Sequence, residues 1–125
     1  MKYTSASNKS VEEVSLAMQE RVKEFKFGVL HIHNIKETLI SKGKNFEKEC
    51  LVLDICNPNY AKEMLDYDME LSMILPCKIS IYQDENTTKI SMLKISELIP
   101  ILNKNLKEKA EEIEKILLEI ISLSK

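Results

Sequence analysis

The sequence predicts an α+β protein: a single small, largely antiparallel sheet with helices packed on one face and a C-terminal amphipathic helix. Three observations support this prediction. Segments with apolar residues at helical spacing alternate with short runs rich in β-branched residues. A polar turn over residues 84–87 joins two of these runs as a hairpin. The final segment repeats apolar residues at helical spacing and so predicts a long helix that buries one face.

Length and composition limit the classes of protein that fit. The 125 residues are expected to form one domain, residues 1–125, with an ordinary globular balance of 44% hydrophobic and 30% charged residues. A net charge of −2, few aromatic residues and no Trp argue against nucleic-acid binding. No apolar stretch could cross a bilayer and no secretion signal is recognisable, so we expect a cytoplasmic protein outside membranes. Three cysteines in a reducing compartment argue against a disulfide framework.

The first half of the chain carries clear helix signals. Ser10 and Glu13 match a capping box ahead of apolar residues at helical spacing, which predicts a helix over residues 11–25. The β-branched and aromatic run that follows predicts a strand. Asn34 is the expected N-cap of a short second helix, which should end at Gly43 because glycine readily adopts the left-handed conformation after a helix.

The second half alternates in the same way. Residues 50–56 predict a strand that is apolar on both faces except for one aspartate, and a capped helix should follow it. Residues 77–93 predict two strands joined by the polar hairpin. A short helix should end near Pro100, and Asn105 with Glu108 predicts a capping box for the last helix.

The first candidate functional residue is a cysteine at a strand end. Cys56 precedes Asn57, the expected N-cap, and Pro58, which suits the first helical position because its missing N–H costs nothing there. Unpaired N–H groups at a helix start stabilise a nearby thiolate, so the pKa of Cys56 could be lowered and its thiol reactive. The alternative is a small buried residue that only packs, and both interpretations stay open.

A second cysteine opens the next strand. The alternation of side chains groups Cys77 with Ile79 and Ile81, and groups Cys56 with Asp54. If the isoleucine- and leucine-rich faces meet the helices, Cys77 points into the core and Cys56 points away from it. This arrangement argues against a disulfide between the two cysteines.

The remaining polar residues give weaker signals. His31 and His33 alternate on one strand face, but no third ligand follows at a recognisable spacing, so we expect surface or hydrogen-bonded histidines and no metal site. Asp54 is the one carboxylate that looks buried, and we expect it to be a hydrogen-bonded turn partner. Glycine-rich phosphate loops and nucleophile elbows are absent. The sequence predicts no cofactor. It leaves enzymatic activity open but favours a protein that is not an enzyme.

Four stretches of the chain carry a resemblance to a known family: "FKFGVLHIHNIKETL", "DICNPNYAKEML", "ILPCKISIY" and "LKEKAEEIEKILLEII". In this order, and over nearly the whole chain, the sequence resembles the domain-of-unknown-function 302 family of small bacterial and archaeal proteins. The resemblance implies a compact α+β domain, often dimeric, with no settled activity. Some members are fused to, or encoded near, sulfur-handling proteins such as rhodanese-like domains, which implies thiol or persulfide chemistry.

The matching motif positions are Cys56, Asn57, Pro58 and Ala61, then Leu75, Pro76 and Cys77, with Gly28 and Val29 in the earlier strand. Two departures stand near them. Lys26 occupies a position where the family usually has glycine, and Ser72 does the same ahead of the second motif. The loop geometry near Ser72 is therefore an open question. Both histidines and Cys50 lie outside the family motifs.

Two functions remain open at this stage. The first is a thiol-bearing binding or redox module linked to sulfur handling, in which Cys56, Asn57, Pro58 and Cys77 form a thiol or ligand site for a small molecule of unknown identity. The alternative is a non-catalytic structural or interaction domain that acts as a homodimer. In that case the two motifs only shape turns, and the cysteines only pack.

Overall fold

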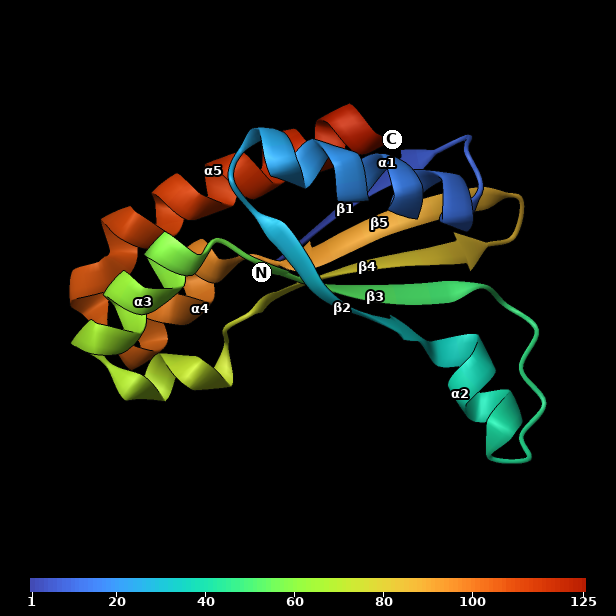
Figure 1. Cartoon of the computed structure of the whole chain (residues 1–125), viewed down its shortest axis with the longest axis horizontal. Coiled ribbons are helices and arrows are strands. Elements are labelled where there is room, and N and C mark those ends of the chain that lie inside the picture. Colours follow the sequence, from blue (N-terminus) through green and yellow to red (C-terminus); the bar gives the residue numbers. More distant parts are fainter.

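The computed structural model describes residues 1–125 and contains one antiparallel sheet of five strands in the order β1-β5-β4-β3-β2 (Figure 1). The fold is α+β, as predicted. The strands are β1 (Lys2–Ser7), β2 (Gly28–Asn34), β3 (Cys50–Cys56), β4 (Cys77–Asp84) and β5 (Thr87–Leu93). The helices are α1 (Val11–Glu24), α2 (Ile35–Ser41), α3 (Pro58–Tyr67), α4 (Ile95–Leu102) and α5 (Lys107–Ser124), with 3₁₀ turns η1 (Met69–Met73) and η2 (Lys104–Leu106).

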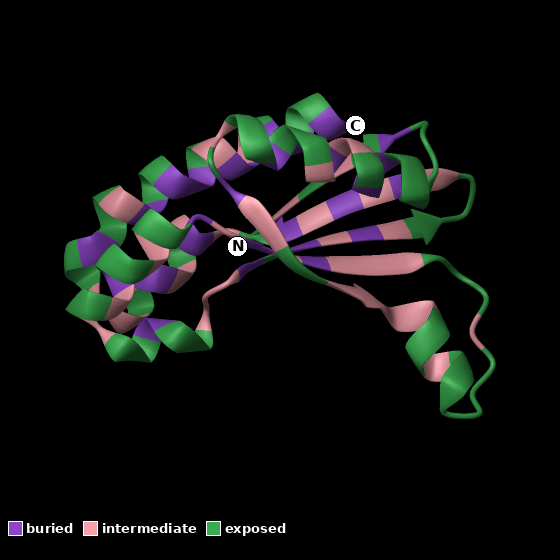
Figure 2. Ribbon diagram, in the orientation of Figure 1, coloured by how far each residue is buried: buried purple, intermediate pink, exposed green.

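The helices cover one face of the sheet. Helices α1 and α5 contact each other and lie across that face, whereas the opposite face carries no helix (Figure 1). Buried positions alternate along β4 and β5, as a sheet with one covered face requires (Figure 2). Helices α3 and α4 gather at one end of the sheet, and α2 projects from the other (Figure 1). None of the helices has the length and apolarity needed to span a bilayer.

The predicted helix signals of the first half are confirmed. The Ser10 hydroxyl accepts from the backbone N–H of Glu13 at 3.1 Å, and the Glu13 carboxylate accepts from the N–H of Ser10 at 2.9 Å. The side chain of Asn34 caps α2. Gly43 follows that helix with a left-handed φ of +83°. These local interactions fix where α1 and α2 begin and where α2 ends.

Strand β1 has no counterpart among the sequence predictions. Its residues are mostly polar, so no run of β-branched or aromatic side chains announces it. The strand exists because it pairs along its whole length with β5, from Lys2 opposite Leu93 to Ser7 opposite Thr88. Long-range pairing therefore decides its conformation.

The predicted capping box at Asn105 and Glu108 is wrong. The turn η2 comes between α4 and α5, and α5 begins at Lys107 with no side-chain cap. The side chain of Asn103 instead accepts from the backbone N–H of Asn105 at 3.1 Å. The cap thus serves the 3₁₀ turn and not the long helix.

Strand β2 contains a β-bulge. Its register pairs Val29 with Ile55 and then His31 with Asp54, so Leu30 is an extra residue without a partner. Val29 therefore shares the helix-covered side with Ile55, whereas both histidines face the uncovered side with Asp54.

The two departures from the family pattern have different consequences for the backbone. Lys26, between α1 and β2, has a φ of +63°, in the left-handed region that glycine adopts most easily. Glycine, which the resemblance implies at this position, would adopt this conformation at a lower cost than lysine. Ser72 lies in η1 and has no positive φ. Serine is therefore accommodated at that position without a left-handed backbone.

Candidate functional site

An apolar pocket of about 160 Å³ lies where β3 ends, α3 begins and β4 starts; we call it the α3 pocket. Eleven of its 14 lining residues are hydrophobic. Both motif stretches contribute to its wall, through Cys56 and Asn57 from the first and through Leu75, Pro76 and Cys77 from the second. The structure therefore brings three of the four predicted site residues to one cavity. The fourth, the proline after Asn57, is exposed and does not line the pocket.

Asn57 and Pro58 begin helix α3 as predicted. The Asn57 side-chain oxygen accepts from the backbone N–H groups of Asn59 at 2.9 Å and Tyr60 at 3.2 Å. Pro58 occupies the first helical position, where no N–H is needed. These two residues fix the direction of the chain at the end of β3 and thereby place Cys56 at the pocket.

Of the two interpretations of Cys56, the structure favours packing over a lowered pKa. Burial raises the pKa of this half-buried thiol above its ordinary value. The N–H groups at the helix start do not offset this effect, because the Asn57 side chain already accepts from two of them. Cys56 is therefore a protonated thiol at neutral pH.

Cys77 lies deeper than Cys56. It is 7% exposed and faces the core with Ile79 and Ile81, as the alternation of side chains predicted. Burial, with a smaller contribution from the charge of Cys56, raises the pKa of Cys77 to about 12. The register places Cys77 opposite Ile55, and no disulfide is formed. The pocket thus has two neutral thiols in its wall.

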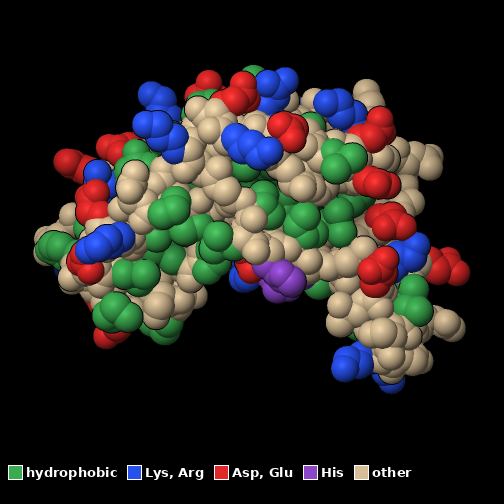
Figure 3. All heavy atoms as spheres, viewed as in Figure 1, with side chains coloured by type: hydrophobic (Ala, Val, Ile, Leu, Met, Phe, Trp, Pro, Cys, Tyr) green, Lys and Arg blue, Asp and Glu red, His purple; other side chains and the backbone are tan.

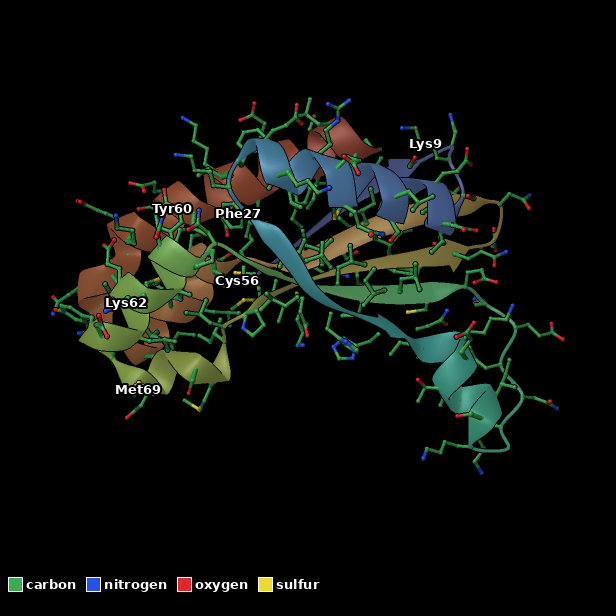
Figure 4. All side chains as sticks on the ribbon, viewed as in Figure 1. Lys9, Phe27, Cys56, Tyr60, Lys62 and Met69 are labelled. Carbon is green, nitrogen blue, oxygen red and sulfur yellow. The ribbon has the colours of Figure 1, made fainter.

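Two aromatic rings complete the pocket (Figure 4). The centroids of Phe27 and Tyr60 lie 6.2 Å apart. The Tyr60 hydroxyl donates to Glu112 at 2.6 Å, which raises the pKa of Tyr60, and Lys109 lies 5.4 Å from the Tyr60 ring centroid. The Tyr60 hydroxyl therefore forms its hydrogen bond outside the pocket, and the Tyr60 ring forms part of the apolar wall. Sequence spacing gives no sign of these residues, because they come from separate elements.

A polar cluster lies on the uncovered face of the sheet. Asp54 accepts from Lys78 at 2.7 Å and from His33 at 2.9 Å, and the bond from Lys78 is the main cause that lowers the pKa of Asp54. His31 stands edge-on to the His33 ring, at 4.4 Å between centroids, and both rings lie on the concave side of the molecule (Figure 3). Asp54 is therefore a partner in a cross-strand ion pair, and its predicted role in a turn is wrong.

This polar cluster does not complete a catalytic or metal site. The structure has no group of three or more His, Cys, Asp or Glu side chains placed to hold a metal ion. No histidine or carboxylate of the cluster contributes to the pKa of Cys56, which burial alone shifts. The Cys56 thiol therefore has no histidine or carboxylate of this cluster to activate it as a nucleophile.

Comparisons with known proteins agree with this architecture. The family model described as "Domain of unknown function DUF302" matches residues 2–123. The crystal structure of an uncharacterized conserved DUF302 protein from Bacillus stearothermophilus superposes with a TM-score of 0.93 and 34% sequence identity, over 99% of this chain and 98% of that chain. The comparison with curated proteins gives no match. The chain therefore belongs to the DUF302 family, as its motifs predicted.

Proposed function

We propose that this protein is a thiol-bearing binding module that holds a small apolar ligand in the α3 pocket. The observation that carries the proposal is the convergence of both motif stretches on one apolar cavity with two thiols in its wall. Leu30 and Ser72 line the pocket and are both exposed, so the cavity is open to solvent and a ligand can enter.

The size and lining of the pocket indicate the class of ligand. A cavity of about 150 Å³ lined by Leu, Ile and Phe binds benzene, and the α3 pocket has about 160 Å³. Protonated thiols are soft and polarizable, and sulfur makes favourable contacts with aromatic rings. An aromatic or sulfur-containing molecule of this size is the ligand that the lining suits best. Such a ligand also fits the sulfur-handling link that the family resemblance implies.

The thiols support reversible binding more than redox chemistry. Both Cys56 and Cys77 have raised pKa values, and a thiol attacks or exchanges as the thiolate. The strand register pairs Cys77 with Ile55, so Cys56 is one residue out of register with Cys77. Directly paired cysteines would suit a cross-strand disulfide better.

A pocket-filling substitution tests the binding proposal. Ala61 lines the pocket, so Ala61→Leu should abolish saturable chemical-shift changes of the Met64 and Ile113 methyl groups during titration with benzene or thioanisole. Ala17→Leu on helix α1 is the matched control, since Ala17 is also half-buried in a helix but lies outside the pocket. Equal binding by the two variants, or no binding by the unmodified chain, would overturn the proposal.

A second candidate function is an interaction domain that acts as a homodimer. The observation in its favour is the uncovered sheet face, which carries half-buried Val52 together with the ion pair between Asp54 and Lys78. A face with both charges can meet a copy of itself across a two-fold axis. Sedimentation equilibrium on the unmodified chain and on Val52→Glu tests it, and a monomer in both cases would exclude this function.

A further inference from the structure

A second cavity lies beside the α3 pocket, between the start of β4, the end of β5 and helix α4; we call it the α4 cavity. Its volume is about 310 Å³, roughly twice that of the α3 pocket, and eight of its nine lining residues are hydrophobic. Buried side chains form its floor: Cys77, Met92, Ile95 and Leu117. Neither the family motifs nor the proposed function assigns a role to this cavity.

The mouth of the α4 cavity exposes large apolar side chains. Met73 is 70% exposed and Leu93 is 57% exposed, and both line the cavity. Exposed apolar surface that continues into a concave, buried apolar floor is typical of a ligand site. The lining comes from η1, two strands, α4 and α5, and its apolar side chains offer room for an aliphatic chain.

One charged residue lines the cavity, and it is positive. The Lys78 side chain is 60% exposed, and its ammonium lies 2.7 Å from Asp54. An ammonium has three donors, and this contact uses one of them. Asp54 also accepts from His33 at 2.9 Å, so Lys78 is one of two donors to this carboxylate. The remaining donors of Lys78 are free to meet an anionic group at the mouth.

We propose that the α4 cavity binds an aliphatic carboxylate, with its chain on the apolar floor and its carboxylate at Lys78. The combination of an apolar lining and a single cation matches the two ends of such a molecule. The site is separate from the α3 pocket, although Cys77 belongs to the wall of both cavities. The proposal therefore does not depend on the function proposed for the α3 pocket.

A titration of the full chain with octanoate tests the proposal, followed through the methyl groups of Met92 and Ile95 by NMR. Octanol and octyltrimethylammonium carry the same chain with a neutral and a positive head. We expect octanoate to bind about tenfold more tightly than octyltrimethylammonium, as a charge-assisted hydrogen bond to an exposed ammonium predicts. Similar affinities for the two ions would overturn the proposal.

Variants separate the contributions of charge and cavity. Lys78→Gln should weaken octanoate binding several-fold and leave octanol binding unchanged, whereas Lys89→Gln, on the neighbouring strand and outside the cavity, should change neither. Leu98→Trp should fill the cavity and remove binding of both ligands. Met73→Glu at the exposed rim is a second variant, because it alters the cavity lining without disturbing the core. An unchanged octanoate affinity in Lys78→Gln would overturn the proposal.

Two further outcomes distinguish other occupants. Ala61→Leu fills the α3 pocket and should leave octanoate binding intact, so a failure of the proposed function does not affect this test. A second copy of the chain would cover the cavity mouth if three results coincide. The unmodified chain would be a dimer, this dimer would not bind octanoate, and the monomer produced by Leu93→Asp would bind it. That outcome would overturn the carboxylate proposal.

Discussion

The two faces of strand β3 differ sharply although they belong to the same seven residues. Leu53 and Ile55 point to the helix-covered side and are fully buried. Val52, Asp54 and Cys56 point to the other side and stay partly exposed. The covered face supplies hydrophobic burial, and the uncovered face carries an ion pair. Substitutions on the two sides should therefore differ in their effect on stability.

The largest expected effect is on the covered face. Leu53→Ala should lower the free energy of unfolding by about 2–5 kcal/mol, because it removes buried methyl groups and leaves a cavity. Val52→Ala, its neighbour on the uncovered face, should cost less than about 1 kcal/mol. Urea denaturation of both variants measures the difference. Equal losses would mean that a partner covers the second face in solution.

The thiols should differ strongly in reactivity. At about pH 8.5, Cys77 should be alkylated more than about 100-fold more slowly than in the urea-unfolded chain, since its pKa is raised to about 12 from about 8.5. Cys56 is less buried than Cys77, so it should react faster than Cys77 and more slowly than a thiol of the unfolded chain. Peptide-level mass spectrometry resolves the sites. Alkylation of Cys77 as fast as that of Cys56 would show that the two positions are equally accessible.

A buried carboxylate on the covered side should matter more than the ion pair on the uncovered side. Glu114 of α5 accepts from the Ser96 backbone N–H at 3.2 Å and from the Ser96 hydroxyl at 2.7 Å, which joins α5 to the start of α4. Glu114→Ala should cost about 1–3 kcal/mol of stability, because it leaves a partly buried donor without a partner. Glu114→Gln keeps an acceptor and is the control. Equal losses in the two variants would contradict the hydrogen-bond explanation.

The smallest effect is expected at Asp54. Lys78 and His33 lower its pKa below the unfolded value of about 3.9, so the stabilisation is present above about pH 4 and is lost as pH falls through the folded-state pKa. Because Lys78 is largely exposed, Asp54→Asn should cost less than about 1 kcal/mol at neutral pH. The difference from the unmodified chain should shrink as pH falls below about 4 and vanish below the folded-state pKa, as urea denaturation at several pH values will show. A difference that persists in acid would point to a steric cause.

Local signals predicted most of the fold, and long-range contacts account for what they missed. The capping box at Ser10 and the apolar run of β3 determine their elements from a few neighbouring residues, so both were predicted. Strand β1 depends on its pairing with distant β5, and it was not predicted. The start of α5 depends on an intervening 3₁₀ turn, and its lack of a side-chain cap was not predicted either. Contacts of this kind cannot be predicted from neighbouring residues in the sequence.

The candidate site was predicted in part for the same reason. Alternation along the strand correctly placed Cys77 in the core. The choice between a reactive and a packing role for Cys56 stayed open, because the burial that raises its pKa depends on residues distant in the sequence. The pocket walls from Phe27 and Tyr60 lie on different elements, so no spacing rule could assemble them.

The bulge at Leu30 has a consequence for how this chain can vary. Because the bulge absorbs one extra residue, Val29 before it and Ile32 after it both face the helix-covered side and pack against the core. Substitutions at His31 and His33 can therefore change the uncovered face while Phe27 and Val29 keep their packing. Deleting Leu30 would leave a regular strand with the same residues on each side of the sheet. The single inserted residue thus leaves both faces of β2 unchanged and adds the exposed side chain of Leu30 to the lining of the α3 pocket.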